Sequence, residues 1–178
     1  MLKEKFEKEI VPQMVSQFGL KNKLAAPRIK QVVLNVGLGR FLGEKETVEK
    51  VIQEMAVISG QKPILTQAKR AISSFKIRQG QKIGLKVTLR GLRMWDFIER
   101  LVFVVLPRVR DFRGLNLSAI DAGGNLTIGI KEHIVFPEVS SDNIKQIFGL
   151  QVCLATTAKN REQGLLLFKM LGFPIKEK

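Results

Sequence analysis

The sequence predicts an α+β fold in two layers, with helices packed on one face of a largely antiparallel sheet and the other face open. Two interspersed sequence patterns predict this fold. Segments with an apolar residue at every third or fourth position indicate helices, and segments in which every second residue is apolar indicate strands. Apolar residues make up 45% of the 178 residues, which is ample for a core. We therefore expect residues 1–178 to form a single domain.

The first expected elements are a helix and a strand. Large apolar residues recur at every fourth position from Leu2 to Met14, which indicates an amphipathic helix. Pro12 is expected to bend or break this helix, and Gly19 to end it. Residues 28–36 then alternate as a strand. The residues expected to share one of its faces are Gln31, Val33 and Asn35.

The middle of the chain is expected to contain a helix and two strands. The helix covers about Glu44–Ser59, and Gly60 follows it as a C-terminal cap. Pro63–Thr66 is a short strand candidate, and Ile83–Arg90 is the clearest strand because apolar residues alternate strictly with polar, glycine or basic ones. Gln67–Lys82, which we call the basic excursion, has few apolar residues and is expected to leave the body of the domain.

The last third of the chain adds a helix, two strands and a final helix. The helix that starts near Met94 should end before Pro107, since proline lacks the N–H and clashes with the preceding turn. Alternating residues predict strands over 126–130 and Leu150–Thr157. Asn160 is well placed to cap the final helix at its N-terminus.

Positive charge is concentrated in the middle of the chain. Residues 61–113 hold thirteen Lys or Arg against three acids, which gives +10 of the chain's net +14. The first sixty residues carry ten against seven (+3), and residues 114–178 carry seven against six (+1). Such a block in a folded chain favours an anionic partner, and nucleic-acid phosphate is the usual one.

The residues that catalysis and metal binding need are nearly absent. The chain has one His, one Cys and no Tyr, so we expect no catalytic residue, no metal and no cofactor. The Gly37–Gly39 turn after a strand does not fit a dinucleotide-binding loop, because the third glycine falls one place late, at Gly43. His133 is expected to be an ordinary surface or edge residue, and Cys153 a small core residue.

Two segments of the cationic block could contact RNA directly. The strand Ile83–Arg90 presents donors about 6–7 Å apart, a spacing that suits successive phosphates or riboses, although an ordinary solvated face would look the same. The basic excursion combines cations with Phe75, which could stack on a base or instead anchor the loop to the body. The donors on the strand are Lys86, Thr88 and Arg90.

A third candidate is Leu106–Gly114, which we call the arginine turn. It brings three arginines and Phe112 together, and arginine suits bidentate contact with phosphate. Asp111 could instead neutralise one of the arginines, so binding and structural roles both remain open. The arginines are Arg108, Arg110 and Arg113.

Several long motifs occur in order nearly from end to end of the chain. They are Ile10-Val11-Pro12, Asn35–Gly39, Ile58–Pro63, Ile77–Gly80, Lys86–Gly91, Leu106–Gly114, Gly129–Glu132 and Phe136-Pro137-Glu138. In these motifs the chain resembles the bacterial-type large-subunit ribosomal protein five, the 5S-rRNA-binding family of the central protuberance. The resemblance implies a structural protein that is not an enzyme and that helps to attach 5S rRNA to the large subunit.

The resemblance also implies roles for individual residues. The 5S rRNA contacts would fall on the sheet face, at Asn35, Gly37, Gln61, Lys86, Thr88 and Arg90. The basic loop before the long strand would reach P-site tRNA, through Ser74, Phe75, Lys76, Arg78, Gln79 and Lys82. Further rRNA or bridge contacts would lie at Lys69, Arg70, Arg108, Arg110 and Arg113.

The implied partners extend beyond 5S rRNA and tRNA. They include large-subunit rRNA, neighbouring proteins of the central protuberance and a small-subunit head protein met in an intersubunit bridge. The part after Arg110 and the segment Phe136–Asn143 are expected to face that bridge. The expected location is a cytoplasmic ribosome, with an organellar ribosome as the alternative.

Two other classes of protein compete with this interpretation. An RNA-modifying or nucleotide-using enzyme would need a catalytic base, a metal cluster or a cofactor loop, and the sequence offers none. A protein that docks on anionic membrane would carry its cations along one face of an amphipathic helix, whereas here they fall mainly on a strand and loops. The longest apolar run, Leu101–Leu106, is also far too short to span a bilayer, so no membrane partner is expected.

Overall fold

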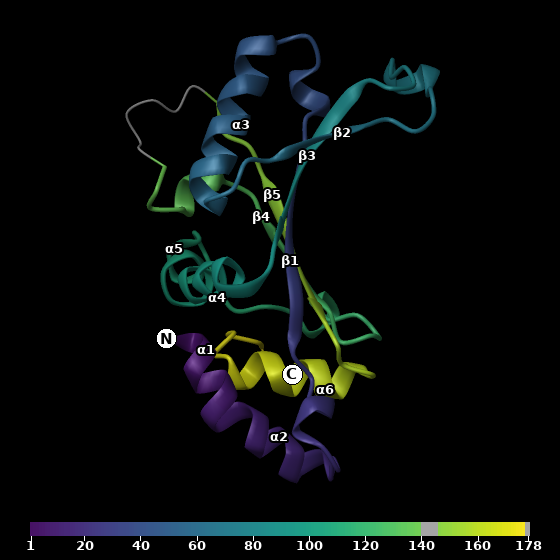
Figure 1. The fold of residues 1–178 in the computed structure, drawn as a ribbon. Helices are drawn as coiled ribbons and strands as arrows, with labels where there is room; N and C mark the ends of the chain where they lie inside the picture. Colours follow the sequence, from purple (N-terminus) through teal and green to yellow (C-terminus); the bar gives the residue numbers. More distant parts are fainter. Residues whose placement is uncertain (140–145, 177–178) are drawn as a thin grey trace. The chain divides into compact units, whose positions relative to one another are not determined.

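The computed structural model describes residues 1–139 and 146–176, and their fold is α+β, as predicted (Figure 1). Five strands of the described part form one sheet in the order β2-β3-β1-β5-β4. The strands are β1 (Ile29–Gly37), β2 (Ile64–Gln67), β3 (Lys82–Leu89), β4 (Leu126–Ile130) and β5 (Leu150–Thr156). The helices are α1 (Leu2–Lys5), α2 (Val11–Phe18), α3 (Lys45–Ser59), α4 (Gly91–Arg100), α5 (Leu106–Arg108) and α6 (Arg161–Met170).

Neighbouring strands of the sheet run antiparallel. β2 pairs with β3 in antiparallel register, with Ile64 opposite Lys86. The N–H of Leu38, just past the end of β1, donates to the carbonyl of Ile83 near the start of β3 (2.8 Å). The N–H of Thr157, just past the end of β5, donates to the carbonyl of Arg28 ahead of β1 (2.9 Å). In each pair the end of one strand lies beside the start of its neighbour, which is the antiparallel arrangement.

By its contacts the chain separates into two compact units. The first unit comprises Met1–Val32, Leu89–Ile128 and Val152–Lys178, and the second comprises Val33–Thr88 and Gly129–Gln151. Each unit has its own buried apolar residues, so each is described separately below.

The strands alternate between buried and more exposed residues, which gives the sheet a covered face and an open face. In β1, Leu34 and Val36 are buried, whereas Asn35 is exposed. In β3, Leu85 and Val87 are buried, whereas Lys86 is exposed. We use "the open face" for the side of the sheet that carries Asn35 and Lys86.

Two prolines of the first unit lie within helical segments, Pro12 in the middle of one and Pro107 next to the last residue of the other. The segment Leu2–Phe18 is helical throughout, and its Phe6–Ile10 part has the wider π-type turn just before Pro12. The segment Gly91–Arg108 repeats the device, with a π-type turn at Leu101–Val105 just before Pro107. The wider turn moves backbone partners away from the proline ring, which an unmodified α-helix cannot do.

The expectation that the third helix ends before Pro107 is therefore wrong, because the helix continues to Arg108. Of the two outcomes expected at Pro12, a bend or a break, the break does not occur, because the segment Leu2–Phe18 is helical throughout. Gly19, with a φ of +58°, does end that helix, as predicted.

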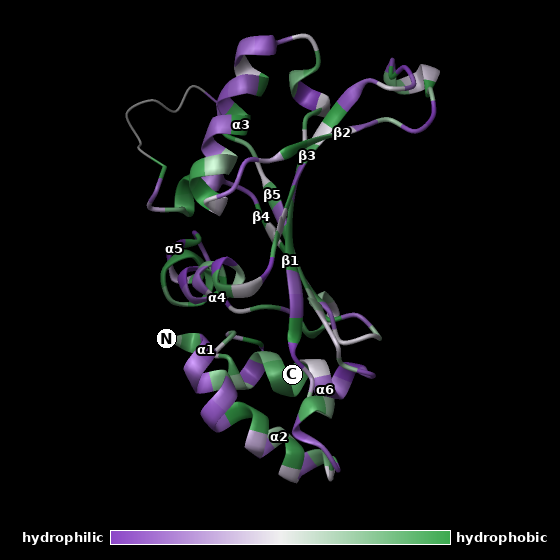
Figure 2. Ribbon diagram, in the orientation of Figure 1, coloured by the Kyte–Doolittle hydropathy of each residue, from purple (hydrophilic) through white to green (hydrophobic). Residues whose placement is uncertain are grey.

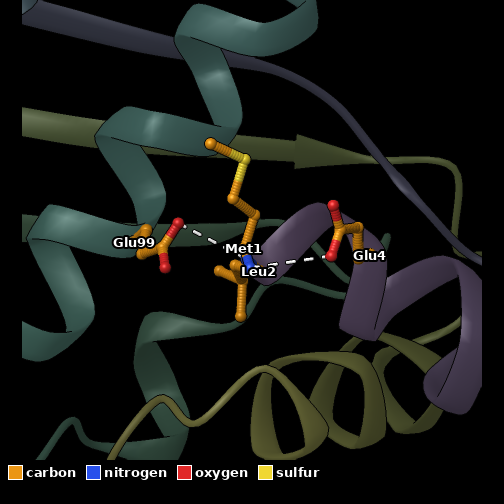
Figure 3. Close-up of polar contacts among 4 residues, drawn as sticks. All are labelled: Met1, Leu2, Glu4 and Glu99. Atoms are coloured by element: carbon orange, nitrogen blue, oxygen red, sulfur yellow. Dashed lines mark hydrogen bonds and ion pairs between the residues drawn. The ribbon is translucent and has the colours of Figure 1, made fainter.

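The start of the chain is held against α4 within the first unit (Figure 3). The N–H of Leu2 donates to a carboxylate oxygen of Glu99 at 3.4 Å, and the Met1 ammonium lies 4.0 Å from Glu4. In the same unit the rings of Phe6 and Trp95 pack with their centroids 5.1 Å apart. Apolar packing, rather than the exposed ion pair, provides most of the stability of this contact.

The remaining helices begin and end close to the predicted residues. α3 starts at Lys45, and Gly60 follows it in the left-handed conformation (φ +65°). Asn160 accepts a hydrogen bond from the N–H of Gln163 at 2.9 Å, which confirms the predicted N-terminal cap of α6. None of the helices in the described segments combines the length and apolar character needed to cross a bilayer.

Candidate nucleic-acid interface

Within the second unit, the strands β2, β3 and β1 bring a polar set together on the open face. Since Leu38 pairs with Ile83, counting back along the two antiparallel strands places Asn35 opposite Lys86. Ile64, which is 69% exposed, lies on the other side of Lys86. Asn35 and Lys86 are both exposed, so a hydrogen-bonding amide and a cation stand side by side.

Gln61 reaches this strand from the end of α3. Gly60 turns the chain, and the buried hydroxyl of Ser59 accepts from the N–H of Gln61 at 3.3 Å while lying 2.8 Å from its carbonyl. The side-chain amide of Gln61 then donates to the carbonyl of Thr88 over a long 3.5 Å. Ser59 is thus a positioning residue that sequence reasoning missed; its place just before the capping glycine was the available signal.

Two glycines lie opposite each other next to this polar set. Counting along the same strands places Gly37 opposite Gly84. A Cβ on Gly84 would come within 2.8 Å of the Thr66 hydroxyl and 3.1 Å of the Val36 carbonyl, whereas a Cβ on Gly37 would meet nothing within 4 Å. Gly84 is therefore required by the packing of three strands, and Gly37 is not.

Arg90 belongs to the first unit. Its guanidinium donates to the side-chain oxygen of Gln31 at 2.6 Å, although the side chain stays exposed. The bond fixes one N–H of the fork and leaves the others available for a partner. The hydrogen bond joins Gln31 of β1 to Arg90, which directly follows β3.

The basic excursion continues the β2–β3 hairpin and ends in a short turn (Figure 1). Ala68 pairs with Gln81, and Ile72 and Ile77 exchange two backbone hydrogen bonds of 2.9 and 3.1 Å. Hydrophilic and hydrophobic residues mix along it in Figure 2. Every predicted contact residue of the excursion is exposed: Lys69, Arg70, Ser74, Phe75, Lys76, Arg78, Gln79 and Lys82.

Phe75 is 70% exposed, so the alternative in which it anchors the excursion to the body is wrong. Lys76, next to it, adopts the left-handed conformation (φ +54°) and closes the turn with its N–H on the Ser73 carbonyl. A bare aromatic ring beside cations is a surface that can stack on a nucleotide.

The arginine turn lies in the first unit, and Arg108, Arg110 and Arg113 are all exposed. Asp111 approaches Arg110 only at 4.0 Å, and both side chains are about nine-tenths exposed, so neutralisation is weak. The turn leaves all three guanidinium groups accessible. Of the bridge segment predicted over Phe136–Asn143, residues 140–143 lie outside the described residues.

His133 is a fully buried residue, so the prediction of a surface or edge position is wrong. Its ring stacks on Phe148 with centroids 3.9 Å apart, and its Nδ1 accepts the N–H of Phe148 at 3.3 Å. Its Nε2 lies 3.2 Å from a carboxylate oxygen of Glu54 on α3, poorly aligned for a hydrogen bond. Three apolar residues directly after it, Ile134–Phe136, were the signal for burial.

The environment of His133 keeps its ring neutral. Burial lowers the pKa of His133 below its ordinary value and raises the pKa of Glu54, which Lys50 partly opposes. Because Nδ1 accepts a backbone N–H, the single ring proton sits on Nε2, facing Glu54. The His133 side chain therefore links α3 to the segment before β5, and these contacts are structural rather than catalytic.

Cys153 is half-buried and faces Thr127 across β4 and β5, with its sulfur 3.8 Å from the hydroxyl. The prediction of a core position is wrong, because its neighbours Val152 and Leu154 take the covered face and leave it on the other. Within residues 1–139 and 146–176, no group of three or more His, Cys, Asp or Glu is arranged to hold a metal ion.

Comparisons with known proteins follow the whole chain. The profile of "Ribosomal protein L5" matches residues 22–78, and the profile of the C-terminus of the same ribosomal protein family matches residues 82–175. The large ribosomal subunit protein uL5 of Fervidobacterium nodosum is 49% identical over 176 residues, which cover 99% of this chain and 96% of the relative. The uL5 proteins of Kosmotoga olearia (47%; 98% and 96% covered) and Symbiobacterium thermophilum (46%; 99% and 98% covered) are similar to the same extent.

Proposed function

The chain belongs to the ribosomal protein L5 family, and from that premise we propose that it binds 5S rRNA on its open face and helps to attach this RNA to the central protuberance. Members of this family are structural proteins of the large ribosomal subunit and not enzymes. The chain thus acts by binding. In its bacterial relatives the subunit is part of the cytoplasmic ribosome, and we assign the same location here.

The observation that carries the proposal is the composition of the open face. Asn35 and Lys86 stand side by side on it, and the Gln61 amide is held at β3 nearby. Amide groups can recognise riboses and base edges, while Lys86 supplies a phosphate contact. Because strand register fixes these groups, an RNA of the wrong shape would leave them unpaired, which supports selection by shape.

Two further contacts are part of the proposal. The basic excursion, with Phe75 exposed among cations, suits the backbone and bases of P-site tRNA. The arginine turn, with its three accessible guanidinium groups, suits large-subunit rRNA or a small-subunit head protein in an intersubunit bridge. Neighbouring proteins of the central protuberance complete the proposed partners.

A binding experiment separates shape selection from simple charge attraction. Filter binding to 5S rRNA and to an unrelated RNA of equal length should be compared over a series of salt concentrations. We expect a preference for 5S rRNA that survives moderate salt, because hydrogen bonds to the open face do not depend on counterion release. Equal binding to both RNAs that collapses with salt would contradict the proposed function.

Variants locate the contact. Asn35→Ala combined with Thr88→Ala should reduce the preference for 5S rRNA without changing the salt slope, since neither residue is charged. Asn116→Ala combined with Ser118→Ala, at two exposed positions of a loop in the first unit, is the matched control. For Arg90, substitution by Ala should cost more than Lys3→Ala with Lys5→Ala, although the latter removes two charges. Equal losses would place the site elsewhere.

A further inference from the structure

A groove of about 560 Å³ opens in the second unit where strands of the sheet end, and of its described lining residues only Gly37 is among the expected 5S rRNA contacts. Gly37 comes from the end of β1, Lys131 follows β4, and Gly149 precedes β5. Arg40 and Ile147 also line it. Since Gly37 belongs to the open face next to Gly84, the groove continues the surface that carries Asn35 and Lys86.

Glycines and the buried residues Phe41 and Phe148 are prominent in the described lining of this groove. A Cβ on Gly37 or on Gly39 would meet nothing within 4 Å, and neither residue has a positive φ. Neither packing nor backbone conformation therefore requires glycine at these two positions. What the missing side chains do provide is close access to the main chain, which is the use of glycine where a ligand backbone approaches.

The charges of the groove have one sign. Arg40 and Lys131 are both exposed, and none of the described residues that line the groove is acidic. Within the described part of the chain, neither cation forms a hydrogen bond or ion pair through its side chain. Two unpaired cations beside accessible main chain form a surface complementary to phosphate.

We propose that this groove binds the sugar-phosphate backbone of the same 5S rRNA, with Arg40 and Lys131 as phosphate contacts beyond the polar set of the open face. The proposal rests on the proposed function, because continuity with Asn35 and Lys86 is what assigns the groove to 5S rRNA. Arg40 can hold a phosphate with two N–H groups, and Lys131 contributes a point charge. Gly37 and Gly39 let the RNA backbone lie against the protein main chain.

The first test removes the charges. Arg40→Gln with Lys131→Gln should lower the slope of log affinity for 5S rRNA against log salt by about 1.4 to 1.8, since each phosphate contact contributes roughly 0.7 to 0.9. Lys5→Gln with Lys8→Gln, at two exposed positions of the first helical segment, should leave the slope within about 0.3 of the wild type. A wild-type slope in the Arg40/Lys131 variant would overturn the proposal.

The second test fills the groove without changing charge. Gly39→Leu should weaken 5S rRNA binding while the melting temperature stays at the wild-type value, because the new side chain enters open space. In hydroxyl-radical footprints, both groove variants should lose protection of one stretch of 5S rRNA, distinct from the stretch lost with Asn35→Ala and Thr88→Ala. Unchanged footprints in both groove variants would assign the groove to another partner and overturn the proposal.

The two proposals can fail separately. If the wild-type protein prefers 5S rRNA and the groove variants behave like the control, only the groove assignment is wrong. If the wild-type protein shows no preference for 5S rRNA, the proposed function is wrong and the groove assignment falls with it.

Discussion

The open face and the basic excursion belong to the same unit and both present groups for RNA, but they hold these groups in different ways. On the open face, Asn35 and Lys86 are fixed by the register of two strands, and Gln61 is held by a hydrogen bond to β3. On the excursion, Phe75 and Lys76 project from a turn that backbone hydrogen bonds close.

This difference gives the two proposed RNA partners two different kinds of contact. On the open face the fold fixes the backbone positions of the groups, so less of the chain is ordered on binding and a matching shape is selected, whereas exposed cations on a turn adapt to their partner. Substitutions that disturb the open face should therefore affect both stability and binding. Substitutions on the excursion should affect binding alone.

The largest expected effect comes from Gly84→Val, in the middle of the three strands. The new side chain would collide with the Thr66 hydroxyl and the Val36 carbonyl, so we expect a loss of about 3 kcal/mol of unfolding free energy or more, together with loss of 5S rRNA binding. Urea titration measures the first and filter binding the second.

Gly129→Val is the matched control for that variant. Gly129 lies in β4, and a Cβ there would meet nothing within 4 Å, so we expect a change below about 0.5 kcal/mol. If the two valine variants are equally stable, β2, β3 and β1 are not closely packed around Gly84. The statement that the fold fixes the open face would then be wrong.

A second strong effect is expected at His133. His133→Ala removes a ring that stacks on Phe148 and leaves the Phe148 N–H without its acceptor, which should cost about 2 to 3 kcal/mol in a urea titration. Phe75→Ala removes an aromatic ring from the exposed excursion and should cost less than about 0.5 kcal/mol. Comparable losses would mean that the excursion is packed rather than free.

His133 also makes the unfolding free energy depend on pH, an effect that comes from its burial and not from the exposed excursion. Because the pKa of His133 is lowered in the folded protein, the unfolded chain binds a proton first as the pH falls below about 6.5, and the unfolding free energy decreases there. The raised pKa of Glu54 acts in the opposite direction, since the folded protein then binds the proton first. Urea titrations at about pH 7.5 and 5.5 measure how much unfolding free energy each protein loses at the lower pH. The wild type should lose more than His133→Gln, and equal losses would contradict this assignment.

Sequence patterns predicted most of the open face and the basic excursion, because strand alternation and loop composition are local properties. β3 appeared within one residue of its expected bounds, and Asn35 and Lys86 reached the exposed face that period-two alternation gives them. The motifs carried the family resemblance, which the profile matches confirmed over residues 22–78 and 82–175.

One error arose from an irregular helical turn, and the others arose where distant parts of the chain come together. Pro107 should end a helix by itself, but a π-type turn ahead of it lets the helix continue. His133 looked like a surface residue because nothing near it in sequence could pair with it, whereas Glu54 and Phe148 come from other elements. No local pattern singles out Arg40 and Lys131, because they line one groove only after the strands assemble.

The smallest effect on stability, and the sharpest test of the comparison, is expected from neutralising the excursion. Lys76→Gln, Arg78→Gln and Lys82→Gln together should change the unfolding free energy by less than about 0.5 kcal/mol, because all three side chains are exposed. The preference for 5S rRNA should persist, while P-site tRNA should dissociate faster from ribosomes reconstituted with the variant.

The arginine turn supplies a control with the same change in charge. Substituting Arg108, Arg110 and Arg113 by Gln also removes three exposed cations, so any general effect of charge on RNA affinity appears in both variants. Faster tRNA release in the excursion variant alone would assign this contact to the excursion. If the excursion variant instead lost its preference for 5S rRNA as strongly as Asn35→Ala with Thr88→Ala, fixed and adaptable groups would serve one partner, and the division between the two regions would be wrong.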